Sequence, residues 1–292
     1  MLLLGVILFQ YFAGGKIIDM PTKTALPDLE RLSIVTAIIM LAFALTQLIS
    51  YPAQNISFSV FGILIDFVLD FNILVIAFSV LLAAAGMDWL IQSHPEAQLF
   101  DNRWETIRHW IVPVLTALVI GVALIAFAGS LLWWVVYIMG SLLLFAVFIG
   151  EYNVFVAGSA VNPLAIVGLN ALSFVLFLLL SIAIFSANIR LYIRLPLLGI
   201  GALMVTSRTL FLRLGEWHTL WGLVISLVVS EVLIGFHYLP LNPIRQGLLL
   251  VGMVYALTSM VTGIKESRRS WAFWGEPVAM LLLTLIVSIV WA

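Results

Sequence analysis

The sequence of 292 residues contains no cysteine. This absence excludes disulfide bonds, a catalytic thiolate, haem attachment through thioethers, and zinc or iron–sulfur sites held by cysteine. It leaves open whether the protein works in an oxidising or a reducing compartment.

Charge is also scarce. Only 9% of the residues are charged, 64% are hydrophobic, and the net charge is -1 at pH 7. A net charge so close to zero creates no field that would attract nucleic acid or acidic substrates, so we expect no nucleic-acid partner. The charges lie mostly between apolar runs that are too long for a soluble core. The chain is therefore expected to be a multi-pass helical membrane protein surrounded by the lipid bilayer.

The signatures of catalysis and cofactor binding are missing. The sequence has no Walker loop, no Gly-x-Gly-x-x-Gly and no Gly-x-Ser-x-Gly. Its histidines form no His-x-x-x-His pair, and each lies near the end of an apolar segment, where we expect an interfacial role. They are His94, His109, His218 and His237. We expect no metal, no cofactor and no catalytic residue, although a single axial ligand to a haem or pigment leaves no such signature. The balance argues against an enzyme.

Nine segments match the ~20 apolar residues that cross a bilayer core. Proline and glycine mark the breaks between them. The segments are Ser33–Tyr51, Asn72–Ile91, His109–Ala128, Leu131–Gly150, Pro163–Ser186, Ile193–Leu212, Trp217–Tyr238, Arg245–Gly263 and Gly275–Ala292. The expected fold is all-α: a single integral membrane domain over residues 1–292, built as a bundle of nine transmembrane helices, with a tenth span as the alternative.

The tenth span would come from the N-terminal segment, residues 1–31. Met1–Gly15 is apolar, but its first basic residue, Lys16, follows the apolar stretch. A cleaved signal peptide carries its positive charge before the apolar stretch. We therefore expect a retained interfacial helix or an additional span.

One apolar stretch, Gln54–Phe71, does not fit the helix pattern. It carries two aspartates and begins with alternating apolar residues at 56, 58 and 60. Alternation is typical of an extended strand, so we expect a short hairpin on the outer face. A re-entrant segment buried among the helices is the alternative.

Orientation follows from the 13 lysines and arginines, which collect on the cytoplasmic side of membrane proteins. If the segment before the first span is cytoplasmic, ten of them lie inside and three outside. The inner residues are Lys16, Lys23, Arg31, Arg103, Arg108, Arg208, Arg213, Lys265, Arg268 and Arg269. The bias predicts that the C-terminus lies outside.

Three stretches of the sequence are distinctive together. They read GMDWLIQSHP at Gly86–Pro95, SRTLFLRLG at Ser207–Gly215 and HYLPLNP at His237–Pro243. Together they resemble a family of bacterial multi-pass membrane proteins of unknown function, over about Asn55 to the C-terminus. The resemblance implies a prokaryotic cytoplasmic membrane, and it implies neither an activity nor a site.

Charged residues inside spans are the candidate functional residues, because each costs at least ~2.5 kcal/mol at a helix centre. Asp88 and Arg208 both lie about 5 Å below the inner interface, so we expect them to form an ion pair. Glu151, Glu276 and Arg213 lie at the same interface. One interpretation is a cytoplasmic vestibule or a site for lipid headgroups. The other, which we favour, is a neutralised polar collar with arginines that extend to the interface.

Glu231 is the deepest acid, about 14 residues into its predicted span. We expect it to face the bundle interior, because lipid would offer it neither a partner nor water. The candidate partners are Arg194, Arg245, Tyr255, Thr258 and Ser259. Glu231 would then either handle protons or cations or form a structural hydrogen bond between helices.

The leading functional prediction is a non-enzymatic scaffold or accessory subunit of a membrane assembly, with other membrane subunits as partners. A small transporter that uses Glu231, or Asp88 with Arg208, is the alternative, and a lipid-modifying enzyme is a third. A cavity that reaches Glu231 would favour transport. A lateral groove beside Asp88 and Glu151 would favour the enzyme, and a closed bundle with an apolar flank the accessory role.

Overall fold

A computed structural model describes residues 27–49, 52, 54–60, 63–93, 104–155, 163–187, 189–266 and 272–290. Within these ranges nine helices are long and apolar enough to cross a membrane, which confirms the predicted all-α bundle. They are α2 (Leu29–Leu48), α3 (Phe71–Gln92), α4 (Trp104–Ala126), α5 (Leu131–Phe155), α6 (Pro163–Ser186), α7 (Leu191–Leu214), α8 (Thr219–His237), α9 (Pro243–Lys265) and α10 (Ala272–Val290). The predicted N-terminal helix, Met1–Gly15, lies outside the described residues.

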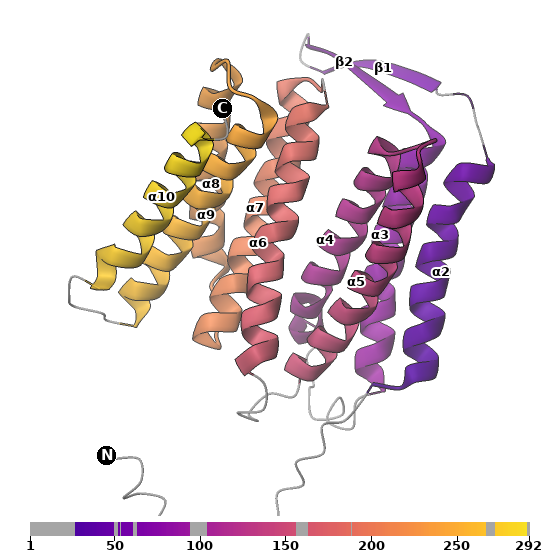
Figure 1. Ribbon diagram of the computed structural model, residues 1–292, viewed down its shortest axis with the longest axis horizontal. Helices are drawn as coiled ribbons and strands as arrows, with labels where there is room; N and C mark the ends of the chain where they lie inside the picture. Colours follow the sequence, from indigo (N-terminus) through magenta and orange to yellow (C-terminus); the bar gives the residue numbers. More distant parts are fainter. Residues whose placement is uncertain are drawn as a thin grey trace, which may run out of the picture.

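A two-stranded hairpin connects α2 to α3. Strand β1 (Gln54–Val60) pairs antiparallel with β2 (Ile63–Leu69), so that Gln54 faces Leu69 across the ladder. Figure 1 shows the hairpin lying across the upper ends of the neighbouring helices. The predicted hairpin is therefore present, in place of the re-entrant alternative, and its location on the outer face stays a prediction. Directly after β2, the Asp70 side chain accepts a hydrogen bond from the Ile73 backbone at 3.0 Å and so caps the first turn of α3.

Helix ends follow local rules. Asn242 caps α9 by accepting from the Arg245 backbone at 2.8 Å, and Pro243 occupies the first helical position. Gly215 ends α7 in the left-handed region, with φ 74°, a conformation that side-chain-bearing residues avoid. These signals explain why the breaks were predictable from sequence.

The helices pack around two apolar cores. One core joins α2, α3, α4 and α5 and contains Phe43 and Phe148. The other joins α6 to α9 and contains Phe177 and Leu250, while α10 packs against α9. Figure 1 shows these groups side by side. Helix α4 contributes residues to both cores, including Leu115 to the core of α6 to α9. It therefore links the half formed by α2 to α5 with the half formed by α6 to α10.

Helix α8 is held against α7 at two small residues. A Cβ added at Gly222 would lie 2.3 Å from the Ser207 hydroxyl oxygen, so the backbones approach as closely as only glycine permits. One turn further along, the Ser226 hydroxyl donates to the Gly199 carbonyl at 2.6 Å. These contacts fix which face of α8 points inward and which points away from the bundle.

Candidate functional site

A buried ionic cluster lies where the two halves meet. Its members are His109 on α4, Glu151 on α5 and Arg208 on α7, which are 2%, 0% and 0% exposed. The Arg208 Nη2 group donates to Glu151 Oε2, and His109 Nδ1 lies 2.9 Å from the same oxygen. Arg208 Nη2 also lies 3.5 Å from His109 Nδ1. One carboxylate oxygen of α5 thus contacts both a guanidinium from α7 and an imidazole from α4, so the cluster joins three helices.

The helices bring these side chains to one depth. His109 is five residues after the start of α4, Glu151 four before the end of α5, and Arg208 six before the end of α7. At ~1.5 Å per residue, all three lie roughly 6 to 9 Å inside the lower helix ends of Figure 1. Helix α5 extends to Phe155, beyond the predicted end at Gly150, so Glu151 lies inside the helix.

Aromatic rings surround the cluster. The Phe155 ring lies edge-on to His109 with centroids 5.2 Å apart. The Phe211 ring carries the Arg208 guanidinium 5.4 Å from its centroid and the Arg108 guanidinium 4.4 Å from it. A ring face attracts cations, so Phe211 stabilises two guanidiniums near each other. The three side chains are shielded from bulk solvent, and the cluster is suited to holding helices together.

Several polar atoms of the cluster have no hydrogen-bond partner in the described part of the chain. They are Glu151 Oε1, Arg208 Nε and Arg208 Nη1. A buried ion pair gains little net stability, but removing one partner strands the other charge in a medium that cannot solvate it. The cluster therefore matters most as a constraint on which helices can be neighbours.

The predicted Asp88–Arg208 pair is wrong. Asp88 is half-buried on α3 and accepts a hydrogen bond from Gln92, one turn along the same helix, at 2.8 Å. Helix α4 contacts both α3 and α7, and Arg208 meets Glu151 and His109 instead. Asp88 lies four residues before the end of α3 and Arg208 six before the end of α7, but apart from α4 the two helices meet different neighbours.

A second polar group joins Arg213 near the lower end of α7, Glu276 near the lower end of α10 and Tyr255 in the middle of α9. The Tyr255 hydroxyl donates to Glu276 Oε1 at 2.6 Å, and Arg213 Nη2 donates to the Tyr255 hydroxyl at 3.3 Å. Arg213 Nη1 lies 3.5 Å from Glu276 Oε1. The structure thus brings Arg213 and Glu276 together, as their shared depth suggested. Unlike the first cluster, this one is partly open, with 24% of the Arg213 and 38% of the Glu276 side chain exposed.

Glu231 does not face the interior, so that prediction is wrong. It lies on the exposed face of α8, and no hydrogen bond or ion pair joins it to any described residue. The proposed partners are engaged elsewhere or lie apart from it. Arg194 donates to the Ile189 carbonyl at 3.3 Å, while Tyr255 donates to Glu276. The physical reason is the close α7–α8 contact at Gly222 and Ser226, which turns the opposite side of α8 outward.

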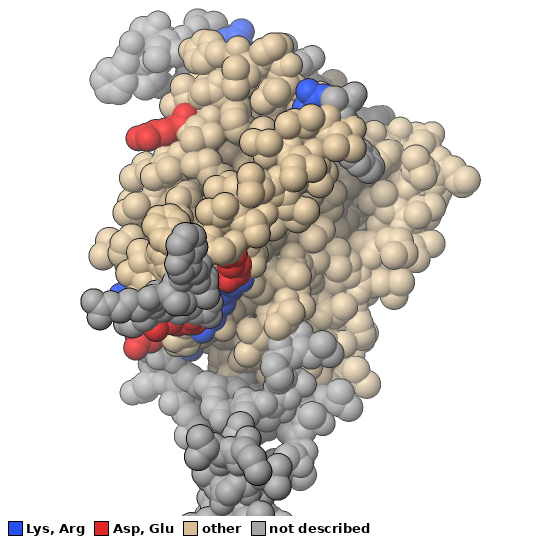
Figure 2. Space-filling model, turned by 60° about the vertical axis from the view of Figure 1, so that its left-hand side comes forward, with Lys and Arg blue, Asp and Glu red and all other residues tan. Residues whose placement is uncertain are grey.

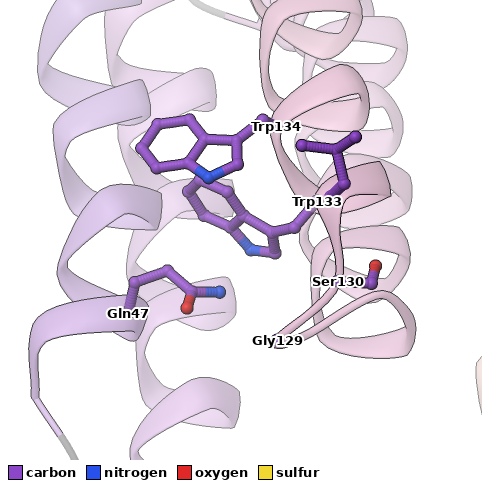
Figure 3. A pocket seen from close by; sticks show the side chains of 6 residues that line it. Gln47, Gly129, Ser130, Trp133 and Trp134 are labelled. Carbon is purple, nitrogen blue, oxygen red and sulfur yellow. The ribbon is translucent and has the colours of Figure 1, made fainter.

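An open pocket of about 350 Å³ lies at the upper end, between α2 and α5. Figure 3 shows Gln47 facing Trp133 and Trp134 across it, with Gly129 and Ser130 in the turn below them. Trp133 is 2% exposed and stacks on Tyr137 with ring centroids 5.0 Å apart. Indole rings favour the membrane–water interface, so the tryptophans that line the pocket are suited to anchoring this end of the bundle there. In the described ranges, no group of three His, Asp or Glu side chains could hold a metal ion.

Comparison with known sequences adds one finding. The sequence profile of DUF5656, described as a protein of unknown function, matches residues 51–292. The chain belongs to the DUF5656 family. Neither a curated protein nor a solved structure matches it. The family match confirms the resemblance to a family of unknown function over nearly the same residues, and it brings no activity or site with it.

In this DUF5656 protein, sequence reasoning missed one residue, His109. It was expected at the membrane interface, but it is buried and touches Glu151. Helix α4 begins at Trp104, earlier than the predicted start at His109, which places the imidazole inside the span. A polar side chain one turn into an apolar helix, at the depth of Glu151, was the available signal.

Proposed function

We propose that the protein is a scaffold or accessory subunit of a membrane assembly and that it binds its partner through the outward face of α8. The observation that carries this proposal is Glu231, an ionisable side chain on the exposed face of a transmembrane helix. It lies six residues before the end of α8, so its backbone is about 9 Å inside the helix end.

The energetics favour a partner at this position. An acid near the bilayer centre costs at least ~2.5 kcal/mol, and even the protonated acid leaves its hydroxyl without a hydrogen bond. Within the described chain nothing bonds to Glu231. A donor from another transmembrane helix would remove that cost. Polar residues on lipid-facing helices are a common means of helix association for this reason.

The rest of the α8 face fits a helical partner. Exposed apolar residues repeat at helical spacing on both sides of Glu231. They are Leu220, Leu223, Val224, Leu227 and Ile234. This pattern forms an apolar stripe interrupted by one acid, which is suited to a helix that carries a matching donor, such as arginine, lysine or a hydroxyl residue. The occupant we propose is therefore a transmembrane helix of another protein with such a donor at the depth of Glu231.

The buried cluster supports the same role. His109, Glu151 and Arg208 lie in closed packing and are sealed by aromatic rings, an arrangement suited to a fixed framework. A transporter would need a cavity that reaches Glu231, and an enzyme would need a groove beside both Asp88 and Glu151. The described pockets are lined by other residues. We further propose that the membrane is the bacterial cytoplasmic membrane and that the C-terminus lies outside.

The test is site-specific photo-crosslinking in native membranes. A photoreactive residue replaces Leu227, one turn from Glu231 on the same face, and the control replaces Leu81 on α3, which is similarly exposed at 66% against 58%. We expect one discrete adduct with a second protein from position 227 and none from position 81. The additional change Glu231→Leu should reduce the adduct at least about fivefold, the equivalent of one lost buried hydrogen bond.

Two results would contradict the proposal. One is an adduct at position 227 whose yield is unchanged by Glu231→Leu. The other is an adduct of twice the mass of this 32.3 kDa chain, because that would make α8 a contact between identical copies. Glu231→Gln serves as the matched control, since an amide retains hydrogen bonding at the same size.

A further inference from the structure

A second open site is lined by the polar cluster of Arg213, Tyr255 and Glu276. It is a groove of about 530 Å³ between α6, α7, α9 and α10 at the lower helix ends. Figure 2 shows acidic and basic side chains gathered in the lower half of the side on which α10 lies, within a largely uncharged surface. Its size falls within the range of sites that bind small amphiphilic molecules.

The two walls of the groove differ in chemistry. One wall comes from α6 and is apolar apart from Asn170, with Val167 65% exposed and Phe174 packed edge-on against Tyr255 at 5.2 Å. The other wall carries Arg213, Tyr255 and Glu276 in contact with one another. A molecule that fills both walls must be apolar on one side and charged on the other. Because the groove runs from the helix ends into the span, a membrane lipid meets this requirement.

The charges specify the headgroup. Arg213 presents a guanidinium, whose planar fork matches a phosphate. The carboxylates of Glu266 and Glu276 line the same groove, so acids outnumber the guanidinium by two to one. The Asn170 amide oxygen also lines it, buried and without a partner in the described chain. These oxygens accept hydrogen bonds and favour a positive group that donates them.

We propose that this groove binds a phospholipid whose headgroup joins a phosphate to a primary ammonium, as in phosphatidylethanolamine. Arg213 binds the phosphate, Glu276 and the Asn170 amide oxygen bind the ammonium, and the α6 wall holds an acyl chain. A quaternary ammonium such as choline carries the same charge but donates no hydrogen bond, and an anionic glycerol headgroup places no cation beside the carboxylates. The site therefore discriminates among lipids of similar shape.

The test is native mass spectrometry of the full chain in detergent with phosphatidylethanolamine, phosphatidylcholine or phosphatidylglycerol of identical acyl chains. We expect the wild type to retain phosphatidylethanolamine at least about fivefold better than the other two lipids. Arg213→Gln should lower that retention about tenfold, the loss expected for a charge-assisted hydrogen bond. Arg31→Gln is the matched control, since Arg31 also lies near the lower ends and pairs with an acid, Asp28, away from the groove.

Glu276→Gln separates recognition from general folding. It removes the carboxylate but keeps an acceptor, so retention of phosphatidylglycerol should rise while that of phosphatidylethanolamine falls. An equal retention of all three lipids by the wild type would overturn the proposal, as would an unchanged preference in Arg213→Gln. Displacement of the lipid by soluble phosphoethanolamine at equal concentration would assign the site to a soluble ligand instead. None of these results depends on a partner at α8, so this proposal and the proposed function fail independently.

Discussion

Glu151 and Glu231 are two acids of the same membrane domain that meet opposite environments. Glu151 is fully buried and contacts Arg208 and His109, whereas Glu231 lies exposed on α8 with no partner in the described chain. A buried acid finds its bonding partners within its own chain. An exposed acid within a span requires a partner from another molecule. The comparison teaches that burial separates residues that hold the fold from residues that meet other molecules.

The largest effect is expected from Glu151→Ala. It leaves the buried Arg208 guanidinium without its counter-charge, which should lower the free energy of unfolding by about 3 to 5 kcal/mol. Glu231→Ala, the matched acid-to-alanine control, should change it by no more than about 0.5 kcal/mol. Denaturant unfolding of both purified variants in detergent checks the contrast. Equal losses in the two variants would remove the distinction between the acids.

The next prediction concerns the double substitution Glu151→Leu with Arg208→Met. Replacing both members of a buried ion pair by apolar residues is often close to neutral, because desolvation offsets the attraction. The double variant should therefore recover at least about half of the loss in free energy of unfolding seen with Glu151→Leu alone. A double-mutant cycle measures the coupling. Losses that simply add would show that the two side chains act independently.

A smaller effect is expected at the contact that turns Glu231 outward. Gly222→Ala places a methyl group against the Ser207 hydroxyl and should lower the free energy of unfolding by about 1 to 3 kcal/mol. Gly235→Ala, on the same helix with nothing within 4 Å of the added atom, is the control and should be neutral or slightly stabilising. If the two variants unfold alike, the close approach of α7 and α8 does not orient the helix.

The smallest effect on stability is expected from introduced cysteines, which test on which side of the membrane each loop lies. The chain has no native cysteine, so single sites can be labelled without background. The positive-inside bias predicts that Ser130→Cys, in the α4–α5 turn, reacts with an impermeant thiol reagent in intact cells. Glu216→Cys, between α7 and α8, should react only after the membrane is opened. The reverse pattern would place the buried cluster near the outer face.

Much of the fold could be predicted from the sequence because long apolar runs show which segments cross the membrane. The predicted span Asn72–Ile91 differs from α3 by one residue at each end, and Pro163–Ser186 coincides with α6. Proline, glycine and capping residues mark these ends locally. The hairpin was also predictable, because the alternation of apolar and polar residues along a strand is a local signal.

The candidate site could be predicted only in part, because depth says nothing about position around the bundle. Asp88 and Arg208 match in depth, yet they lie on helices separated by α4. Helix α3 is apolar on all sides, so its sequence does not indicate which face turns inward. The predicted direction of Glu231 was wrong for the same reason, since it depends on the contact of Gly222 with Ser207 on another helix. Arg213 and Glu276 meet because both lie near helix ends and because their helices, α7 and α10, both pack on α9.

The contact between His109 and Glu151 has a consequence for the order of synthesis. Arg208 follows Glu151 by 57 residues, so at about 5 to 20 residues per second the carboxylate exists for roughly 3 to 11 s before its guanidinium has been made. His109 precedes Glu151 by 42 residues and is therefore present from the start. The imidazole can therefore contact the carboxylate while α2 to α5 assemble. The carboxylate is then already positioned to bind Arg208 when α7 enters the membrane.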